Sequence, residues 1–211
     1  MGTPDTHQIE FFFDLSSPWT YLGFTNVQRV ASRTGATLLL RPVLVGAVFN
    51  AVNKFLYELR ALPADAPRMR HAWKVLDDWA ALAGITINFP PKAHPARSVH
   101  AMRMASALED DQPALLAFAK AAFEAYFGRD ENLDDPDVLI AAANGAGLDG
   151  AAIHTRSVTD EIKARLRART DDLIARGGYG SPTIFVDRDD MYFGNDQLPL
   201  VEFALQRAQR T

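Results

Sequence analysis

Two serine-proline pairs, Ser17-Pro18 and Ser181-Pro182, are the positions where this sequence is best suited to chemistry. Ser17 comes directly before a proline and an apolar stripe, which is the pattern of a helix start. A hydroxyl there can donate a hydrogen bond to an anion at the positive end of the helix dipole. Because the chain has no cysteine, a thiolate at this position has to come from a ligand. By residue type alone, simple helix capping is the favoured interpretation of Ser17. We predict that it holds a ligand thiolate because of the motifs that accompany it elsewhere in the chain, which are described below.

The stabilisation that such a thiolate needs is within reach of one hydroxyl and a helix dipole. A free thiol with a pKa of about 8.5 is only a few per cent ionised at neutral pH. Lowering that pKa by roughly two units requires about 2.7 kcal/mol. A hydrogen bond to a charged group contributes about 1.5–3 kcal/mol, and a helix N-terminus contributes about 0.3–1 kcal/mol. Ser16 competes for the same role, and we favour Ser17 because it directly precedes Pro18.

The composition excludes several other kinds of chemistry. Without cysteine, the chain has no disulfide, thiol nucleophile or dithiol redox centre of its own. Its basic residues are dispersed in a chain of net charge -4, which argues against nucleic-acid binding. The histidines show no metal-binding spacing, so no metal site is expected. No apolar run is long enough to span a membrane and no secretory pattern precedes residue 9, so we expect a cytoplasmic protein without membrane partners.

A strand, a helix and a second strand have to position Ser17. The aromatic-rich residues 9–15 predict a buried strand, and the apolar stripe after Pro18 predicts a helix that ends at Gly35. Residues 37–43 predict the second strand. Because a helix connects the two strands, we expect them to pair in parallel.

A long helical block follows these strands. From about residue 46 to residue 177 the apolar spacing is helical, with one segment at 68–83 and a long charged helix at 158–176. Trp73 and Trp79 have helical spacing, so we expect them in the core rather than in a substrate platform.

The C-terminal part returns to strands and then ends in a helix. Residues 181–187 and 191–193 predict a short hairpin with its turn at Asp189-Asp190. Asn195-Asp196 then opens the last helix, which either residue could cap. With the helical block set aside, the order of elements is that of thioredoxin.

Three motifs carry a resemblance to known proteins: F-D-L-S-S-P-W-T-Y-L at 13–22, G-Y-G-S-P-T-I-F-V at 178–186 and Y-F-G-N-D-Q-L at 192–198. The chain resembles the DsbA-like branch of the thioredoxin superfamily, in particular the kappa-class glutathione transferases and the 2-hydroxychromene-2-carboxylate isomerases. This resemblance implies an α/β, thioredoxin-like fold with a large all-helical insertion. Residues 8–45 and 178–211 would form the thioredoxin-like, glutathione-binding domain, and residues 46–177 would form the inserted helical domain.

The resemblance also implies how the centre of glutathione would bind. Oxidoreductase relatives carry C-x-x-C where this chain has Ser17-Pro18-Trp19-Thr20. Ser181-Pro182 is similar to the cis-proline element of these proteins, so we expect a cis peptide bond before Pro182. That element would leave the backbone amide and carbonyl of Ser181 free to pair with the cysteinyl residue of glutathione.

The ends of glutathione would meet other residues, again as the resemblance implies. Asn195 and Asp196 would hold the γ-glutamyl end. Asn53 would lie near the ligand, and Arg68 would meet the glycyl carboxylate in place of a lysine. Gln197 stands where an arginine is common, so no charge contact is carried over to that position.

By this resemblance, the expected activity is glutathione-dependent cis–trans isomerisation of an aromatic unsaturated keto acid, or of its cyclic hemiketal, through reversible addition of the thiolate. Two alternatives stay open. A kappa-class-like transferase would leave the sulfur bonded to its electrophile and consume glutathione. A non-catalytic DsbA-like peptide-binding protein would show no preference for this tripeptide. The resemblance implies a homodimer whose partners are glutathione and a small aromatic substrate.

Overall fold

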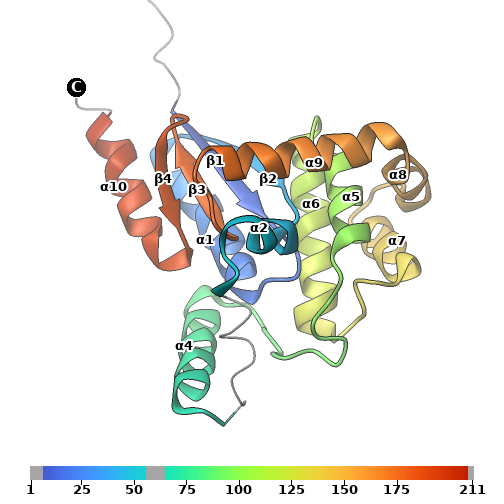
Figure 1. The fold of residues 1–211 in the computed structure, drawn as a ribbon, viewed down its shortest axis with the longest axis horizontal. Helices are drawn as coiled ribbons and strands as arrows, with labels where there is room; N and C mark the ends of the chain where they lie inside the picture. The colour runs from blue at the N-terminus through green and yellow to red at the C-terminus, as the bar shows by residue number, and fades with distance from the viewer. Residues whose placement is uncertain (1–6, 56–64, 209–211) are drawn as a thin grey trace, which may run out of the picture.

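Within the described residues, 7–55 and 65–208 of a computed structural model, four strands form one mixed sheet (Figure 1). They are β1 (Gln8–Phe13), β2 (Thr37–Pro42), β3 (Thr183–Val186) and β4 (Asp190–Phe193), in the spatial order β2-β1-β3-β4. β2 is parallel to β1, whereas β3 is antiparallel to both β1 and β4. The predicted parallel β-α-β unit is therefore confirmed.

Helices occupy most of the rest of the described chain. α1 (Pro18–Thr34) connects β1 to β2, and a short 3-10 helix, η2 (Asn195–Gln197), leads into α10 (Leu198–Ala208) after β4. Between β2 and β3 lie α2 (Val45–Val52), α4 (Pro67–Ala83), α5 (Val99–Ala107), α6 (Gln112–Phe123), the π-helical η1 (Glu124–Gly128), α7 (Pro136–Gly145), α8 (Gly150–Ser157) and α9 (Asp160–Ala175). Among the helices described, none has the length and apolar character of a membrane span. The expected α/β fold with a helical insertion is confirmed.

The helix that follows β1 begins and ends where the sequence predicts. The Ser17 hydroxyl caps α1 by accepting a hydrogen bond from the Thr20 amide at 3.2 Å. Gly35 ends the helix in the left-handed region, with φ of 69°, which a glycine adopts without steric cost. The charged helix α9 starts later than residue 158 because Thr159 caps it, accepting from the Ile162 amide at 3.4 Å.

The hairpin turn between β3 and β4 lies earlier than predicted. It consists of residues 187–189, so Asp189 lies in the turn as predicted, whereas Asp190 was placed wrongly because it already belongs to β4. The Asp187 carboxylate accepts a hydrogen bond from the Gln8 amide at 2.9 Å. This contact with β1 holds the turn at 187, where φ is 47°.

Both faces of the sheet are covered, which explains why β1 lacks apolar–polar alternation. Phe11 and Phe13 belong to a core on one face that includes Phe24 of α1. Phe12 points to the opposite face and packs in a smaller cluster with Leu173 of α9. Ser17 therefore follows a strand that is held by packing from both sides.

The inserted helices share the larger core with α1. Tyr21 of α1 stacks on Phe123 of α6, with ring centroids 4.9 Å apart and an interplanar angle of 10°. Trp73 and Trp79, which were expected in the core, are both only partly buried. Trp79 packs against this core, whereas Trp73 meets Phe89 edge to face at 6.5 Å. The start of α1 is thus fixed by the insertion as well as by the sheet.

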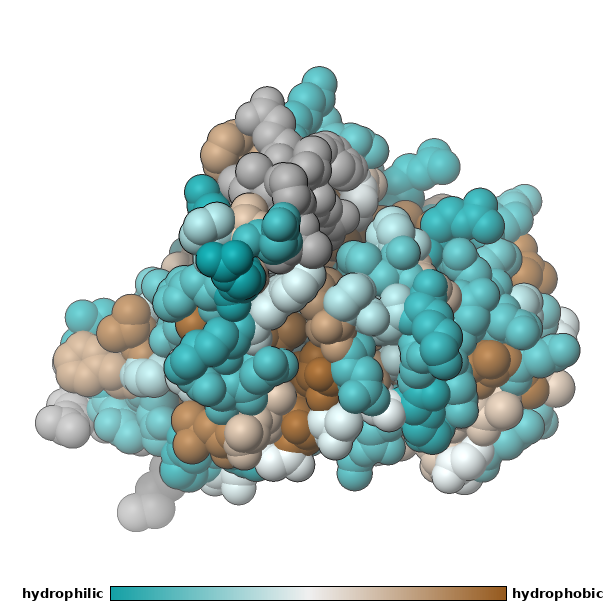
Figure 2. All heavy atoms as spheres, turned by 90° about the horizontal axis from the view of Figure 1, so that it is seen from below, coloured by the Kyte–Doolittle hydropathy of each residue, from teal (hydrophilic) through white to brown (hydrophobic). Residues whose placement is uncertain are grey.

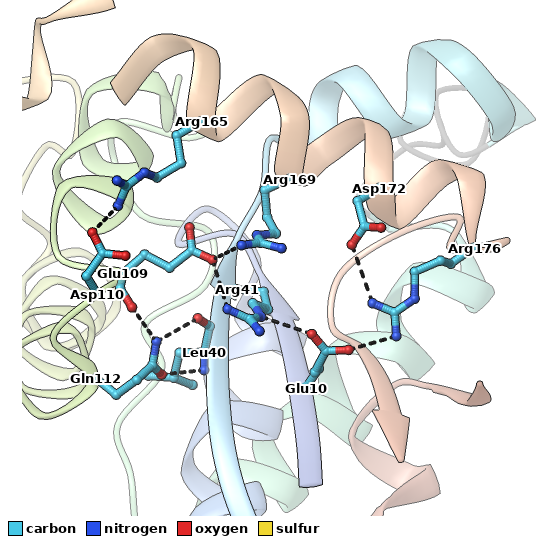
Figure 3. A network of polar contacts seen from close by, with 10 residues as sticks. All are labelled: Glu10, Leu40, Arg41, Glu109, Asp110, Gln112, Arg165, Arg169, Asp172 and Arg176. Carbon is cyan, nitrogen blue, oxygen red and sulfur yellow. Dashed lines mark hydrogen bonds and ion pairs between the residues drawn. The ribbon is translucent and has the colours of Figure 1, made fainter. Parts of the chain in front are cut away.

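A network of charged side chains fastens the sheet to the inserted helices (Figure 3). Arg41 of β2 donates to Glu10 of β1 at 3.0 Å and to Glu109 at 3.2 Å. Arg169 of α9 lies 2.7 Å from the same Glu109 carboxylate, and Arg176 binds Glu10 at 2.8 Å. Two buried carboxylates therefore bridge arginines from β2, from α9 and from just after α9.

Candidate active site

Ser17 and Ser181 lie in one hydrogen-bonded cluster, although they are far apart in the chain. The Thr20 amide donates to Ser17 Oγ at 3.2 Å, and Thr20 Oγ1 lies 2.9 Å from Ser181 Oγ. The Asp14 amide donates to Ser181 Oγ at 3.0 Å. The start of α1 and the segment before β3 therefore meet at the end of the central strands.

The two adjacent serines differ in how their hydroxyl protons are used. Ser16 Oγ donates to Asp14 Oδ1 at 2.8 Å, so its single proton is already used in a hydrogen bond within the protein. Ser17 Oγ accepts from Thr20, and no acceptor for its own proton is found among the described residues. Ser17 is thus the helix cap of the simpler interpretation, and it also keeps a proton that can be donated to a ligand.

The peptide bond between Ser181 and Pro182 is cis, as predicted. Ser181 is only 7% exposed, yet no hydrogen bond within the described residues uses its backbone amide or carbonyl. The Pro182 carbonyl accepts from the Gly194 amide at 3.1 Å, which places the segment before η2 beside this element. An extended peptide could therefore pair with the backbone of Ser181.

Asn195 is buried against α1, whereas Asp196 is exposed. The side-chain amide of Asn26 donates to Asn195 Oδ1 at 2.8 Å, and Asn195 Nδ2 is buried without a partner among the described residues. Neither Asn195 nor Asp196 forms a side-chain cap at the start of η2, so the expected capping is not found. Gly194 has φ of 98°, a backbone conformation that other residues rarely adopt, which explains the glycine.

Asn53 joins this region, whereas Arg68 does not contact it. Asn53 ends α2, and its Nδ2 donates to the carbonyl of Tyr179 at 3.0 Å, close to Ser181 in the chain. Arg68 is exposed on the first turn of α4, and no hydrogen bond or ion pair within the described chain joins it to Ser17 or Ser181. The predicted role of Arg68 stays a prediction.

Three residues that the sequence patterns do not single out contact the predicted site residues: Asp14, Thr20 and Asn26. Asp14 directly follows the apolar run of β1. An acidic residue at the end of a buried strand is a sequence signal that could have identified it. Thr20 stood in the quoted motif at 13–22, but its contact with Ser181 had no sequence signal. Asn26 is an ordinary polar position of a helix.

A cavity of about 710 Å³ lies outside this cluster, between α1, the end of α4 and η1. Tyr21, Arg29 and Glu124 line it, and neither Ser17 nor Ser181 does. Burial raises the pKa of Tyr21 to about 12, with a further contribution from the charge of Glu124, so the phenol stays protonated at neutral pH. Figure 2 shows apolar atoms near the middle of one face of the molecule, between hydrophilic flanks.

The cluster has the parts needed to hold an anion attached to a peptide. The N-terminus of α1 supplies the positive end of a helix dipole, and Ser17 supplies one donor. Ser181 supplies an unused backbone amide and carbonyl. Since the chain has no cysteine, none of these groups can act as a thiol nucleophile.

Comparison with known proteins finds similarity over nearly the whole chain. The family model described as a DSBA-like thioredoxin domain matches residues 8–206. The 2-hydroxychromene-2-carboxylate isomerase of Sphingobium xenophagum is 29% identical over 199 residues, which cover 93% of this chain and 97% of that protein. Glutathione S-transferase kappa 1 of Rattus norvegicus is 26% identical over 214 residues, which cover 96% of this chain and 92% of that protein.

A solved structure is also similar to this chain in its fold. The structure of a 2-hydroxychromene-2-carboxylate isomerase superposes with a TM-score of 0.77 at 26% identity, covering 96% of each chain. Similarity in sequence therefore extends to both isomerases and transferases.

Proposed function

Because the chain belongs to the family of DSBA-like thioredoxin domains, we propose that it is a glutathione-dependent cis–trans isomerase acting on an aromatic unsaturated keto acid or its cyclic hemiketal. Similarity over nearly the whole chain to 2-hydroxychromene-2-carboxylate isomerases, in sequence and in fold, supports this choice. The observation that carries the proposal is the unused proton of the Ser17 hydroxyl beside the unused backbone of Ser181. In a chain without cysteine, that pairing suits a ligand that brings a thiol on a peptide.

The residues present fit glutathione chemically. The backbone of Ser181 can pair with the cysteinyl residue, as strands pair. Asn195 has a buried Nδ2 donor without a partner in the described chain, which suits an oxygen of the γ-glutamyl end, and Asp196 is exposed beside it and suits the amine. We also propose that Asn53 lies along the ligand and that Arg68 meets the glycyl carboxylate.

When bound, glutathione would supply a thiolate that adds to a conjugated carbon–carbon double bond, permits rotation about the resulting single bond and is then expelled. Ser17 would donate its hydroxyl proton in a hydrogen bond to the sulfur, which favours the ionised form. The amides at the start of α1 would add the positive end of the helix dipole. The chain itself would form no covalent bond and undergo no redox change.

We expect both glutathione and its S-methyl derivative to raise the melting temperature of the protein. Ser181 and Asn195 would bind the peptide part of both ligands, whereas only glutathione offers the thiolate to Ser17, so its shift should be larger. A ligand at about 100 times its Kd adds about 2.7 kcal/mol to the free energy of unfolding. At about 2–4 °C per kcal/mol for a chain of this size, the shift is readily measured by thermal denaturation.

A linear tripeptide, Glu-Cys-Gly with an ordinary peptide bond, is the control for this binding experiment. The proposed site should prefer glutathione, whereas a general peptide-binding protein should not distinguish the two. If neither glutathione nor its S-methyl derivative stabilises the protein, the proposed function is wrong.

With 2-hydroxychromene-2-carboxylate as the probe substrate, we expect turnover to require glutathione and to leave its concentration unchanged. In an isomerisation by reversible addition, each thiolate is released intact, whereas a transferase loses one thiol for each product. The measurement is a free-thiol titration during many turnovers. Stoichiometric loss of thiol would instead favour the transferase alternative, which the similarity to glutathione S-transferase kappa 1 keeps open.

A further inference from the structure

Asp14 is a fully buried carboxylate at the end of β1. Its Oδ1 accepts hydrogen bonds from the Ser16 amide at 2.9 Å and from the Ser16 hydroxyl at 2.8 Å. Its Oδ2 accepts from the Val45 amide at 2.9 Å and from the Ser98 hydroxyl at 2.9 Å. An ionised carboxylate has about four acceptor positions, so these donors use its whole capacity.

The donors to Asp14 come from three separate parts of the fold. Ser16 lies in the loop before α1, Val45 begins α2 and Ser98 directly precedes α5. All four are neutral groups, so the buried charge is stabilised by hydrogen bonds rather than by an ion pair. The Asp14 carbonyl also accepts from the Ser17 amide at 3.4 Å. The carboxylate therefore ties the loop that carries Ser17 to two inserted helices.

We propose that Asp14 is a positioning residue that makes Ser17, and not Ser16, the hydrogen-bond donor to glutathione; the inference rests on the proposed function. Asp14 accepts a hydrogen bond from the Ser16 hydroxyl, so this hydroxyl cannot donate to glutathione at the same time. By binding the Ser16 amide and the starts of α2 and α5, it holds the loop in the conformation that presents Ser17. Asp14 acts through the two serines.

Asparagine has nearly the shape of aspartate but cannot fill this role. Its amide has one acceptor oxygen, and its NH2 group would face either the donors of Ser16 or those of Val45 and Ser98. A hydroxyl can turn to accept, but a backbone N–H cannot, so the amide of either Ser16 or Val45 loses its acceptor. The loop has to shift, and a shift of about 1 Å can lower turnover about a hundredfold.

Asp14→Asn has two effects on a bound thiolate, and they have opposite signs. Removing a negative charge favours a nearby anion and by itself lowers the pKa of the glutathione thiol. Displacing the Ser17 hydroxyl removes a hydrogen bond to the thiolate and raises that pKa. A positioning role therefore predicts a raised pKa, whereas a charge effect alone predicts a lowered one.

The experiment is a pH titration of the thiolate absorbance of glutathione bound to the unmodified protein, to Asp14→Asn and to Asp149→Asn. Asp149 caps α8 by accepting from the Ala152 amide at 2.9 Å, and asparagine caps helices equally well, so this control removes a carboxylate outside the cluster. We expect a higher thiol pKa and about ten- to hundredfold lower turnover of 2-hydroxychromene-2-carboxylate for Asp14→Asn. Asp149→Asn should match the unmodified protein.

A lowered or unchanged pKa in folded Asp14→Asn, with glutathione still bound, overturns the positioning role alone. If Asp14→Asn does not fold, Ser98→Ala carries the test, because it keeps the carboxylate and removes one of its four hydrogen bonds. A raised pKa is expected there too, and an unchanged one counts against the proposal. Absence of glutathione binding by the unmodified protein overturns the proposed function and this inference with it.

Discussion

Replacing Ser17 by alanine should raise the pKa of the thiol of bound glutathione by about one to two units. The lost hydrogen bond to a charged sulfur is worth about 1.5–3 kcal/mol, and about 1.36 kcal/mol corresponds to one pKa unit. Turnover at neutral pH should fall about tenfold or more and recover in part as the pH rises, since more of the thiol then ionises without help. The measurement is a titration of the thiolate absorbance, paired with turnover across the same pH range.

Ser16→Ala is the matched control for this variant. The Ser16 hydroxyl already donates to Asp14, so its loss should change the thiol pKa less. Ser17→Ala also removes the cap of α1, which costs about 0.5–2 kcal/mol and leaves the protein folded. If the titration curve of Ser17→Ala overlays that of the unmodified protein, Ser17 is only a helix cap and the proposed activation is wrong.

Replacing Glu109 by alanine should lower the free energy of unfolding by about 3–5 kcal/mol. Glu109 is 6% exposed and binds Arg41 at 3.2 Å and Arg169 at 2.7 Å (Figure 3). Arg41 keeps its bond to Glu10, but Arg169 loses its carboxylate partner. Urea denaturation measures the change, and thermal denaturation should show a drop of about 2–4 °C for each kcal/mol.

The neighbouring carboxylate provides the control for this prediction. Asp110 binds Arg165 at 2.5 Å, and this hydrogen bond lowers the pKa of Asp110, but its side chain is 70% exposed. Solvent screens exposed pairs, so Asp110→Ala should cost at most about 1 kcal/mol. If Glu109→Ala and Asp110→Ala lower the free energy of unfolding equally, the buried Glu109 ion pairs do not stabilise the fold more than an exposed pair does.

Sequence patterns were sufficient for the elements whose boundaries are set by local residues. Pro18 fixes a helical φ at the start of α1, and Gly35 supplies the left-handed residue that ends it. They were insufficient where a distant contact sets the boundary, as at the β3–β4 turn. There Asp187 binds the Gln8 amide, and this contact across the sheet overrides the local preference of Asp189-Asp190.

The sequence alone was enough to place a serine at a helix start in a chain without a thiol, because capping, proline and cysteine count are local or compositional properties. It favoured Ser17 over Ser16 only from the position of Pro18, and it held no information on which hydroxyl proton is already used inside the protein. The use of that proton depends on Asp14, whose carboxylate meets Val45 and Ser98, which lie 31 and 84 positions away in the chain.

The contact between Ser181 and the start of α1 also depends on tertiary structure, since Thr20 and Ser181 are separated by 161 positions. Whether two hydroxyls share a hydrogen bond depends on a few tenths of an ångström in their separation. Such distances are set by how β1, α1 and the inserted helices pack around a shared core, and no local pattern of residue types encodes them.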